Sequence, residues 1–330
     1  AMRLADRTVD WERYWIVGSY HYLRQEFEKA IPAYEALLRL YPDHRWVGGN
    51  LRGAYHGALL STAHDAWSRR DARATLVAVD AARRSLDRMP RIVREPMWTL
   101  LVGFCLALGR PGDAREIAKR MQDDDERHLG LALVAWSAGD LPRMGEEIKR
   151  VRVAMRPGML GTTQWPSAAW LMIRAGRLEV AQKMLDDLEK EKNASSASLR
   201  GGLKGDLLLA RGDVDGSIES LRTYLSAQTF VWGGSYRAAD SLAEALTRHG
   251  DPWQAAEALK VALAAPRPTG NVIPGGFYQI QLQLRLAELH HLLGRVEEAR
   301  EVEDDVAKLL AVAEPDFPLL VQLERLRRQP

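Results

Sequence analysis

The residue types that carry chemistry are scattered along this chain, and none falls into the spacing of a known reaction centre. Its eight histidines include no HExxH pair, the arrangement that places two zinc ligands on one helix face. His290 and His291 are neighbours, so on a helix their side chains point about 100° apart and do not share a metal. Cys105 falls on an apolar helical face, where a buried thiol is inert. We therefore predict no catalytic residues, no bound metal and no cofactor.

Three further motifs resemble ligand sites but fit helix ends and turns better. The acidic run 123–126 lacks the glycine and the final glutamate of a calcium-binding loop, and it precedes a helix whose N-terminus such carboxylates cap. The tripeptide Arg211-Gly212-Asp213 matches an integrin-binding motif, but it occupies a turn that recurs along the chain. The glycines of 201–205 follow no strand, so a phosphate-binding loop is not expected there.

The composition is that of an ordinary globular protein with a sizeable core. Of 330 residues, 27% are charged and 46% hydrophobic. The net charge of +2 produces no global field that would attract nucleic acid, so we predict no direct nucleic-acid binding. No stretch reaches 18 uncharged apolar residues, so this segment is not expected to insert into a membrane. A single cysteine excludes an intramolecular disulfide.

The start of the sequence, Ala1-Met2, does not resemble a natural start, so we expect a piece of a longer protein. The sequence does not decide the compartment. The segment is cytoplasmic, or it is extracytoplasmic if a transmembrane helix precedes it in the full-length protein. The oligomeric state is equally open from sequence.

Apolar residues that recur at i, i+3, i+4 and i+7 predict helices, as in Leu282-Leu286-Leu289-Leu293. A turn recurs between these helices, in which a glycine is followed five positions later by a small or apolar residue. Glycine suits the left-handed conformation that ends a helix. The glycines lie 30 to 44 residues apart, a period typical of stacked helical hairpins. They are Gly109, Gly139, Gly176, Gly212, Gly250 and Gly294.

The first repeat is the clearest, and it reads Tyr14-x2-Val17-Gly18-x2-His21, then Ala30-x3-Tyr34-x2-Leu37, then Pro42. This pattern resembles the tetratricopeptide repeat (TPR), although His21 and Leu37 depart from the commonest choices. The resemblance extends over about residues 11 to 310. It implies an all-α fold, a right-handed superhelical solenoid of about eight TPR-like hairpins.

We expect a single solenoid over residues 1–330, with an irregular pair of helices near its start. That pair is predicted as one helix from Trp46 to Ser61 and another from Arg73 to Asp87. The expected divisions are a lead-in (1–10), the clearest repeat (11–44), the irregular pair (45–90), further repeats (91–310) and a C-terminal cap (311–330).

The opening segment also resembles the repeat regions that follow bacterial Ser/Thr protein kinase domains or winged-helix transcription regulators. The resemblance rests on Leu4-Ala5-Asp6-Arg7, Trp11-Glu12-Arg13-Tyr14, Phe27-Glu28-Lys29-Ala30-Ile31 and Tyr41-Pro42-Asp43. In those families the repeats sense or dock. The kinase glycine loop and catalytic loop are not in this sequence, so the resemblance implies a neighbourhood rather than an activity.

In the repeat family, ligands lie along the inner surface that the first helices of the pairs form. When the usual inward positions are transferred to this chain, they predict a partner-binding surface that changes from aromatic to charged. Its proposed contacts are Trp15, Tyr22, Trp136, Trp170, Asp206 and Arg237.

Three connections, 156–166, 226–235 and 265–276, are longer than a repeat turn and carry apolar residues. They join successive pairs, so we expect them on one edge of the stack, where they either plug gaps or form a docking edge. The proposed edge residues are Trp165, Phe230, Trp232 and Phe277.

The sequence therefore predicts a non-catalytic module that binds a protein or peptide, within a larger bacterial signalling protein. Two alternatives remain. One is a regulatory fragment of a Ser/Thr protein kinase whose catalytic domain lies outside this sequence, and the other is a structural, self-associating solenoid.

Overall fold

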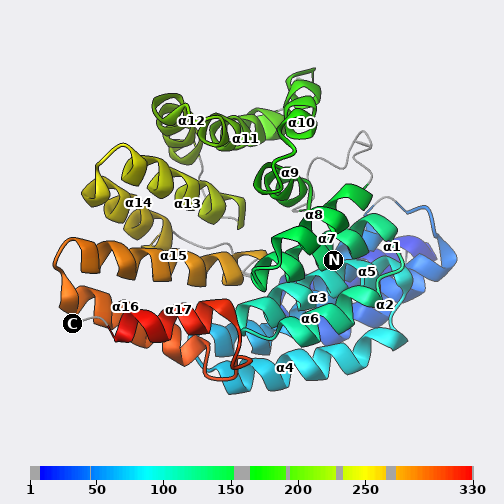
Figure 1. The fold of residues 1–330 in the computed structure, drawn as a ribbon. Helices are drawn as coiled ribbons and strands as arrows, with labels where there is room; N and C mark the ends of the chain where they lie inside the picture. Colours follow the sequence, from blue (N-terminus) through cyan, green and yellow to red (C-terminus); the bar gives the residue numbers. More distant parts are fainter. Residues whose placement is uncertain are drawn as a thin grey trace. The chain divides into compact units, whose positions relative to one another are not determined.

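In the computed structural model, every regular element of the described residues is helical. The described residues are 8–44, 46–151, 164–190, 194–227, 233–264 and 273–328. They contain 17 α-helices and one short 3-10 helix, and no strand (Figure 1). The chain divides into two compact units, residues 1–101 and 102–330. The all-α fold of paired helices predicted from the sequence is confirmed.

The first unit begins with two helical pairs, α1 with α2 and α3 with α4, in which each helix packs on its partner. Gly18 of α1 lets the ring of Tyr34 approach closely, because a Cβ at this position would lie 2.6 Å from the ring. The helices are α1 (Asp10–Leu23), α2 (Phe27–Leu40), α3 (Val47–Ser68), α4 (Ala72–Ser85), η2 (Leu86–Arg88) and α5 (Arg91–Ala107), the last of which runs across the boundary between the units.

The predicted break after Ser61 was wrong, because α3 continues without interruption to Ser68. Leu60, Ala63 and Ala66 are fully buried, and Trp67 is almost so. These residues extend one apolar face of α3 past the polar sequence that suggested a loop. Burial of that face outweighs the weak local helix preference of the segment.

The second unit continues the alternation of paired helices. Consecutive helices pack on each other, and the first helix of a pair also contacts the first helix of the next, from α7 through α9, α11 and α13 to α15. These odd-numbered helices form an inner layer. The helices are α6 (Pro111–Lys119), α7 (Asp124–Ser137), α8 (Leu141–Arg150), α9 (Gln164–Arg174), α10 (Leu178–Lys190), α11 (Ala194–Ala210), α12 (Val214–Ser226), α13 (Gly233–Arg248), α14 (Pro252–Ala264), α15 (Ile273–Leu292), α16 (Val296–Leu309) and α17 (Pro318–Arg327).

All six repeat glycines have a left-handed backbone, with φ from 69° to 93°, as the sequence predicted. The residue five positions after each glycine is fully buried, because the second helix packs there against the first. The aspartate of Arg211-Gly212-Asp213 caps α12 by accepting a hydrogen bond from the Gly216 N–H. Asp123 caps α7 in the same way. These motifs therefore serve the fold.

The segment before α17 closes the second unit against its first turn. The Glu314 N–H donates to the carbonyl oxygen of Gly109 at 2.8 Å, and the Gly112 N–H donates to the Glu314 Oε1 at 2.9 Å. A Cβ at Gly109 would lie 2.5 Å from that of Ala313 and 2.8 Å from the ring of Phe317. The first and last parts of this unit are therefore in direct contact.

Candidate binding pocket on the inner helices

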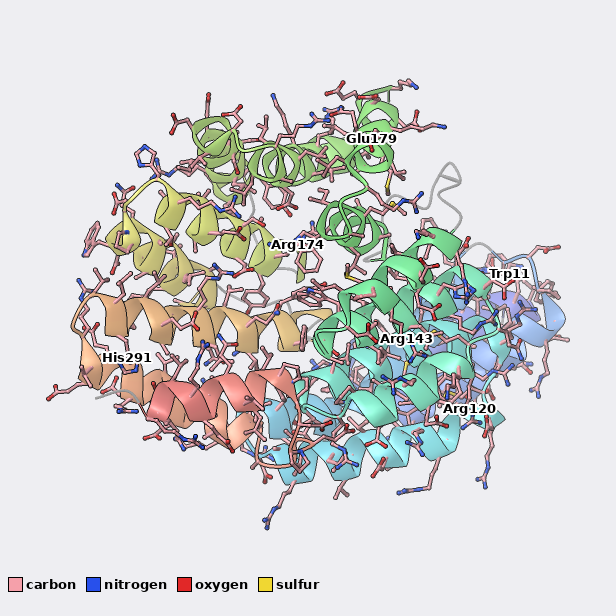
Figure 2. All side chains as sticks on the ribbon, viewed as in Figure 1. Trp11, Arg120, Arg143, Arg174, Glu179 and His291 are labelled. Atoms are coloured by element: carbon pink, nitrogen blue, oxygen red, sulfur yellow. The ribbon has the colours of Figure 1, made fainter. Side chains whose placement is uncertain are left out.

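A pocket of about 210 Å³ opens between three consecutive helices of the inner layer, α9, α11 and α13. Each helix contributes three residues, and the set mixes apolar side chains with both signs of charge. Arg174, labelled in Figure 2, extends from the last turn of α9. The lining residues are Trp170, Ile173, Arg174, Asp206, Leu209, Ala210, Ser241, Glu244 and Arg248.

Helical periodicity explains why these residues share one surface. Arg174 follows Trp170 by one turn, and Ala210 follows Asp206 in the same way. On α13, Ser241, Glu244 and Arg248 are spaced by three and four residues. Residues at these intervals lie on one helix face. The predicted inward positions on α9 and α11, Trp170 and Asp206, therefore line a common pocket.

The charged groups of the pocket are balanced and engaged in ion pairs. Glu244 lies between two arginines, with Arg174 Nη2 at 3.3 Å and with Arg248 on its own helix. Arg237 Nε lies 3.7 Å from Asp206 Oδ2, and both of these side chains are buried. The guanidinium groups of Arg174 and Arg237 also lie 5.2 Å and 6.0 Å from the Trp170 ring centre, within reach of a cation–π contact.

Asp206 has an unusual environment for a carboxylate. Burial raises its pKa above the usual range, and the nearby Arg237 guanidinium opposes that shift. The Ser241 hydroxyl also lies near enough to lower this pKa, but neither carboxylate oxygen accepts a hydrogen bond of regular geometry from the described residues. The pocket therefore contains a buried acceptor whose capacity the chain leaves unused.

An aromatic cluster fills the inner layer beside this pocket. The Trp136 ring meets the rings of Trp170 and Phe277 edge-on, with distances between ring centres of 4.5 Å and 5.1 Å. Tyr278 lies 5.8 Å from both tryptophans, and Phe317 lies 6.3 Å from Phe277. Because Phe277 belongs to α15 and Trp136 to α7, the cluster joins helices that are distant in sequence.

The predicted contacts Trp136 and Phe277 thus lie in packed surroundings. Trp136 is half-buried, while Phe277 is only 4% exposed. Phe277 lies inside α15, which begins at Ile273, so the predicted loop ends earlier than residue 276. Both side chains occupy inner-layer space with the protein's own atoms.

The first-unit candidates, Trp15 and Tyr22, are half-buried and pack around Tyr34. Their ring centres lie 6.1 Å and 6.4 Å from that of Tyr34. The Trp15 ring also lies 5.2 Å from His44. These contacts hold α1 against α2 and the segment after it.

The remaining predicted contacts lie outside what the structure describes. Phe230 and Trp232 fall in 228–232, outside the described residues. Trp165 belongs to the first turn of α9, but its side chain is not among those described. The docking edge therefore stays a prediction.

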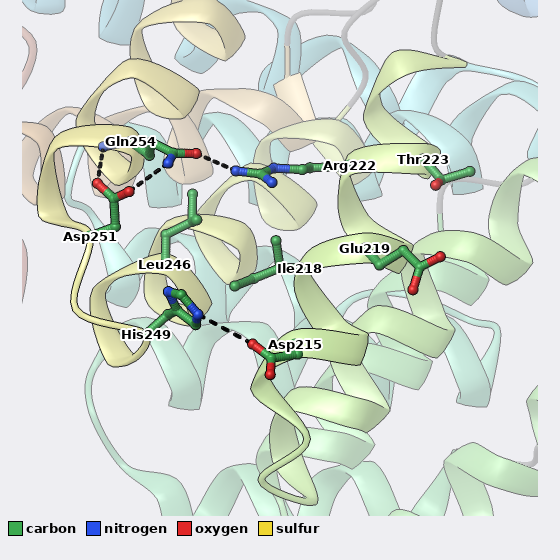
Figure 3. A pocket seen from close by; sticks show the side chains of 9 residues that line it. All are labelled: Asp215, Ile218, Glu219, Arg222, Thr223, Leu246, His249, Asp251 and Gln254. Atoms are coloured by element: carbon green, nitrogen blue, oxygen red, sulfur yellow. Dashed lines mark hydrogen bonds and ion pairs between the residues drawn. The ribbon is translucent and has the colours of Figure 1, made fainter.

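A second, more open depression lies between α12 and the turn from α13 to α14, with a volume of about 460 Å³ (Figure 3). Its polar residues pair across the surface: His249 Nε2 lies 3.4 Å from Asp215 Oδ1, and Arg222 donates to Gln254. The His249 and Asp215 side chains are 56% and 86% exposed. Solvated, mutually paired groups of this kind offer little to a ligand, so we favour the inner pocket.

Sequence reasoning missed Arg174, Ser241 and Arg248. Arg174 and Ser241 follow the predicted inward positions Trp170 and Arg237 by four residues, and Arg248 follows the pocket residue Glu244 by four. Extending the predicted inward positions by one turn would have found Arg174 and Ser241.

Within the described residues there is no group of three or more His, Cys, Asp or Glu side chains arranged to hold a metal ion. None of the helices described is both long and apolar enough to cross a membrane.

Comparisons with known proteins identify repeats in two separate segments. Residues 14–44 and residues 203–271 each match a family model described as tetratricopeptide repeat. No curated protein matches the chain significantly.

Solved structures that match include a tetratricopeptide repeat protein from Parabacteroides merdae, 14% identical, covering 83% of this chain and 99% of that chain with a TM-score of 0.41. The TPR domain of P58(IPK) is 12% identical and covers 97% and 98% of the two chains with a TM-score of 0.28. The two family matches fall at segments where paired helices and their turns are seen, and they show tetratricopeptide repeats in residues 14–44 and 203–271.

Proposed function

We propose that this chain is a non-catalytic interaction module, and that the inner helices of its second unit bind a segment of a partner protein. Tetratricopeptide repeats are generally protein–protein interaction modules, and nothing in the comparisons points to enzyme activity. The observation that carries the proposal is the pocket between α9, α11 and α13, where three consecutive pairs direct aromatic and polar side chains into one depression.

The aromatic cluster limits where the partner segment lies. It already fills the inner layer where Trp136 of α7 meets Phe277 of α15. The partner segment therefore follows α9, α11 and α13 and contacts the pocket-lining residues. Long-range charge attraction contributes little, because the pocket carries balanced charge.

The test is a comparison of captured proteins between two variants used as bait. Ala210 lines the pocket and is exposed, so Ala210→Trp obstructs the pocket with little cost to folding. Ala81→Trp places the same side chain at an exposed position of α4, a residue that does not line the pocket. We expect mass spectrometry to identify a protein that binds the wild type and Ala81→Trp but not Ala210→Trp. Equal capture by all three baits contradicts the proposal.

We further propose that the module belongs to a bacterial signalling protein, as the resemblance of its opening segment implies. A kinase or DNA-binding domain encoded before residue 1 supports this context. The alternative of a structural, self-associating solenoid predicts a concentration-dependent mass in sedimentation analysis, and a constant monomer mass excludes it.

A further inference from the structure

The inner pocket contains a buried donor as well as a buried acceptor that the chain does not use. Trp170 is 2% exposed, and its indole Nε1 has no acceptor among the described residues. Asp206 is 4% exposed, and its carboxylate oxygens accept no hydrogen bond of regular geometry there either, although Arg237 and the Ser241 hydroxyl are close by. Nearly all buried polar groups in native proteins are hydrogen-bonded. A ligand group that accepts a hydrogen bond from the Trp170 Nε1 and donates one to the Asp206 carboxylate therefore binds this pocket more tightly than a group that does neither.

The charges around the pocket select against ions of either sign. A carboxylate entering the pocket approaches Asp206 and Glu244. A cationic side chain approaches Arg174 and Arg248, with Arg237 close behind Asp206. Each of these arginines and carboxylates is already engaged in an ion pair, Asp206 with Arg237 and Glu244 with Arg174 and Arg248, so an added charge finds no free counter-ion and loses its own hydration. A neutral polar group avoids both costs.

We propose that the pocket binds the side-chain carboxamide of a glutamine or asparagine in the partner segment. The carboxamide oxygen accepts a hydrogen bond from Trp170 Nε1, and the carboxamide NH2 donates to Asp206. A carboxamide carries a donor and an acceptor without charge, which is the complement of these two atoms. A volume of about 210 Å³ holds several non-hydrogen atoms of such a side chain. This inference rests on the proposed function and specifies the residue type recognised.

The test uses four small probes of similar length: N-acetyl glutamine, glutamate, lysine and methionine, each as its methylamide. The indole N–H signal of Trp170 is assigned in an NMR spectrum and followed during each titration. We expect the glutamine probe to shift this signal saturably and to bind at least about tenfold more tightly than the other three. No shift with any probe means that the pocket holds solvent only and overturns the proposal, as does stronger binding of the glutamate, lysine or methionine probe.

Two variants separate the donor from the acceptor. Trp170→Phe keeps an aromatic ring in the cluster but removes the N–H, and its effect is read from the other shifting signals of the pocket. It should weaken glutamine binding by about threefold to tenfold. The matched control, Trp253→Phe, changes a half-exposed tryptophan of α14 that does not line the pocket, and it should leave binding unchanged. Equal binding by Trp170→Phe and the wild type contradicts the proposed contact.

Asp206→Asn removes the carboxylate while keeping its shape. The wild type should bind the glutamine probe much more tightly than the glutamate probe. Asp206→Asn should lose most of that difference, because position 206 then carries no negative charge to repel the glutamate carboxylate. Melting temperatures show whether each variant is folded. Unchanged discrimination in folded Asp206→Asn rejects Asp206 as the acceptor. If probes fail but Ala210→Trp still loses a partner, the carboxamide inference is wrong and the proposed function survives.

Discussion

The helix–helix turns of the two units have the same backbone geometry but different residues at the critical position. In the first unit Gln25 and Arg70 adopt φ of 59° and 58°, and in the second unit six glycines adopt similar angles. The following N–H bonds a carbonyl five residues back in both cases, as Glu26 does to His21 and Arg110 does to Cys105. Packing of the paired helices therefore imposes the turn, and glycine lowers its cost without being required.

The largest effect should come from Gly109, where backbone conformation and tertiary contact coincide. Gly109→Ala adds a Cβ that overlaps Ala313 and strains a left-handed residue. We expect the free energy of unfolding to fall by about 3 kcal/mol or more, from backbone strain and overpacking together. Urea denaturation measures this change, and a loss below about 1 kcal/mol would show that the closing segment does not pack there.

A half-buried histidine pair should make the first unit sensitive to acid. His56 Nε2 and His64 Nε2 lie 3.1 Å apart on α3. Burial lowers the pKa of both, that of His64 to about 4. The unfolded chain takes up these protons near pH 6.5, so stability is full above that pH and is lost as the pH falls to about 4, by about 3 kcal/mol for His64.

The measurement is urea unfolding at a series of pH values. His64→Phe should flatten the dependence in this range. His249→Phe, at an exposed position of the second unit, should leave it as in the wild type. A dependence that survives in His64→Phe would place its origin elsewhere.

A substitution at Gly139 tests the effect of backbone strain alone, without a new tertiary contact. It has φ of 73°, and nothing lies within 4 Å of a Cβ added there. Gly139→Ala should therefore cost only about 1 kcal/mol, the price of a left-handed alanine. A cost as large as that of Gly109→Ala would mean that contacts with the closing segment are not what distinguishes the two glycines.

The smallest effect should be a gain in stability in the first unit. Gln25 is exposed, so Gln25→Gly relieves its left-handed backbone without losing packing. Greater freedom of glycine in the unfolded chain offsets part of the benefit, which leaves about 0.5 kcal/mol. Gln25→Ala serves as the control and should bring no gain in the melting temperature. Equal stability of both variants would show that the turn is unstrained.

Local signals explain which parts of the fold the sequence predicted. The glycine turns, the capping carboxylates of the run 123–126 and the small residues after each turn are each encoded within a few positions, and all were found. The continuation of α3 to Ser68 was not found, because it depends on the burial of Leu60 and Trp67 by tertiary packing, which no local sequence pattern shows. The turns at Gln25 and Arg70 carry no glycine, so a search for that residue passed over them.

Sequence reasoning could predict which residues of each single helix face inward, but not which helices come together at the candidate site. Trp170 and Asp206 were found by transferring the inward positions of the repeat family to this chain, and Arg174 lies one helical turn after Trp170. The contact between Trp136 and Phe277 joins residues that are several repeats apart in sequence, and no local sequence pattern predicts a contact over such a separation. The sequence could not show that aromatic rings fill part of the surface expected to receive a partner.

The bond between Glu314 and Gly109 also changes how the second unit is expected to unfold. In an open repeat array each repeat touches only its neighbours, so the ends fray first and the molecule unzips stepwise. Here the last segment holds the first turn across about 200 residues. Fraying at either end breaks the same contact, which couples the two ends into one cooperative transition. Such distant contacts also slow folding, because a long loop must close before they form.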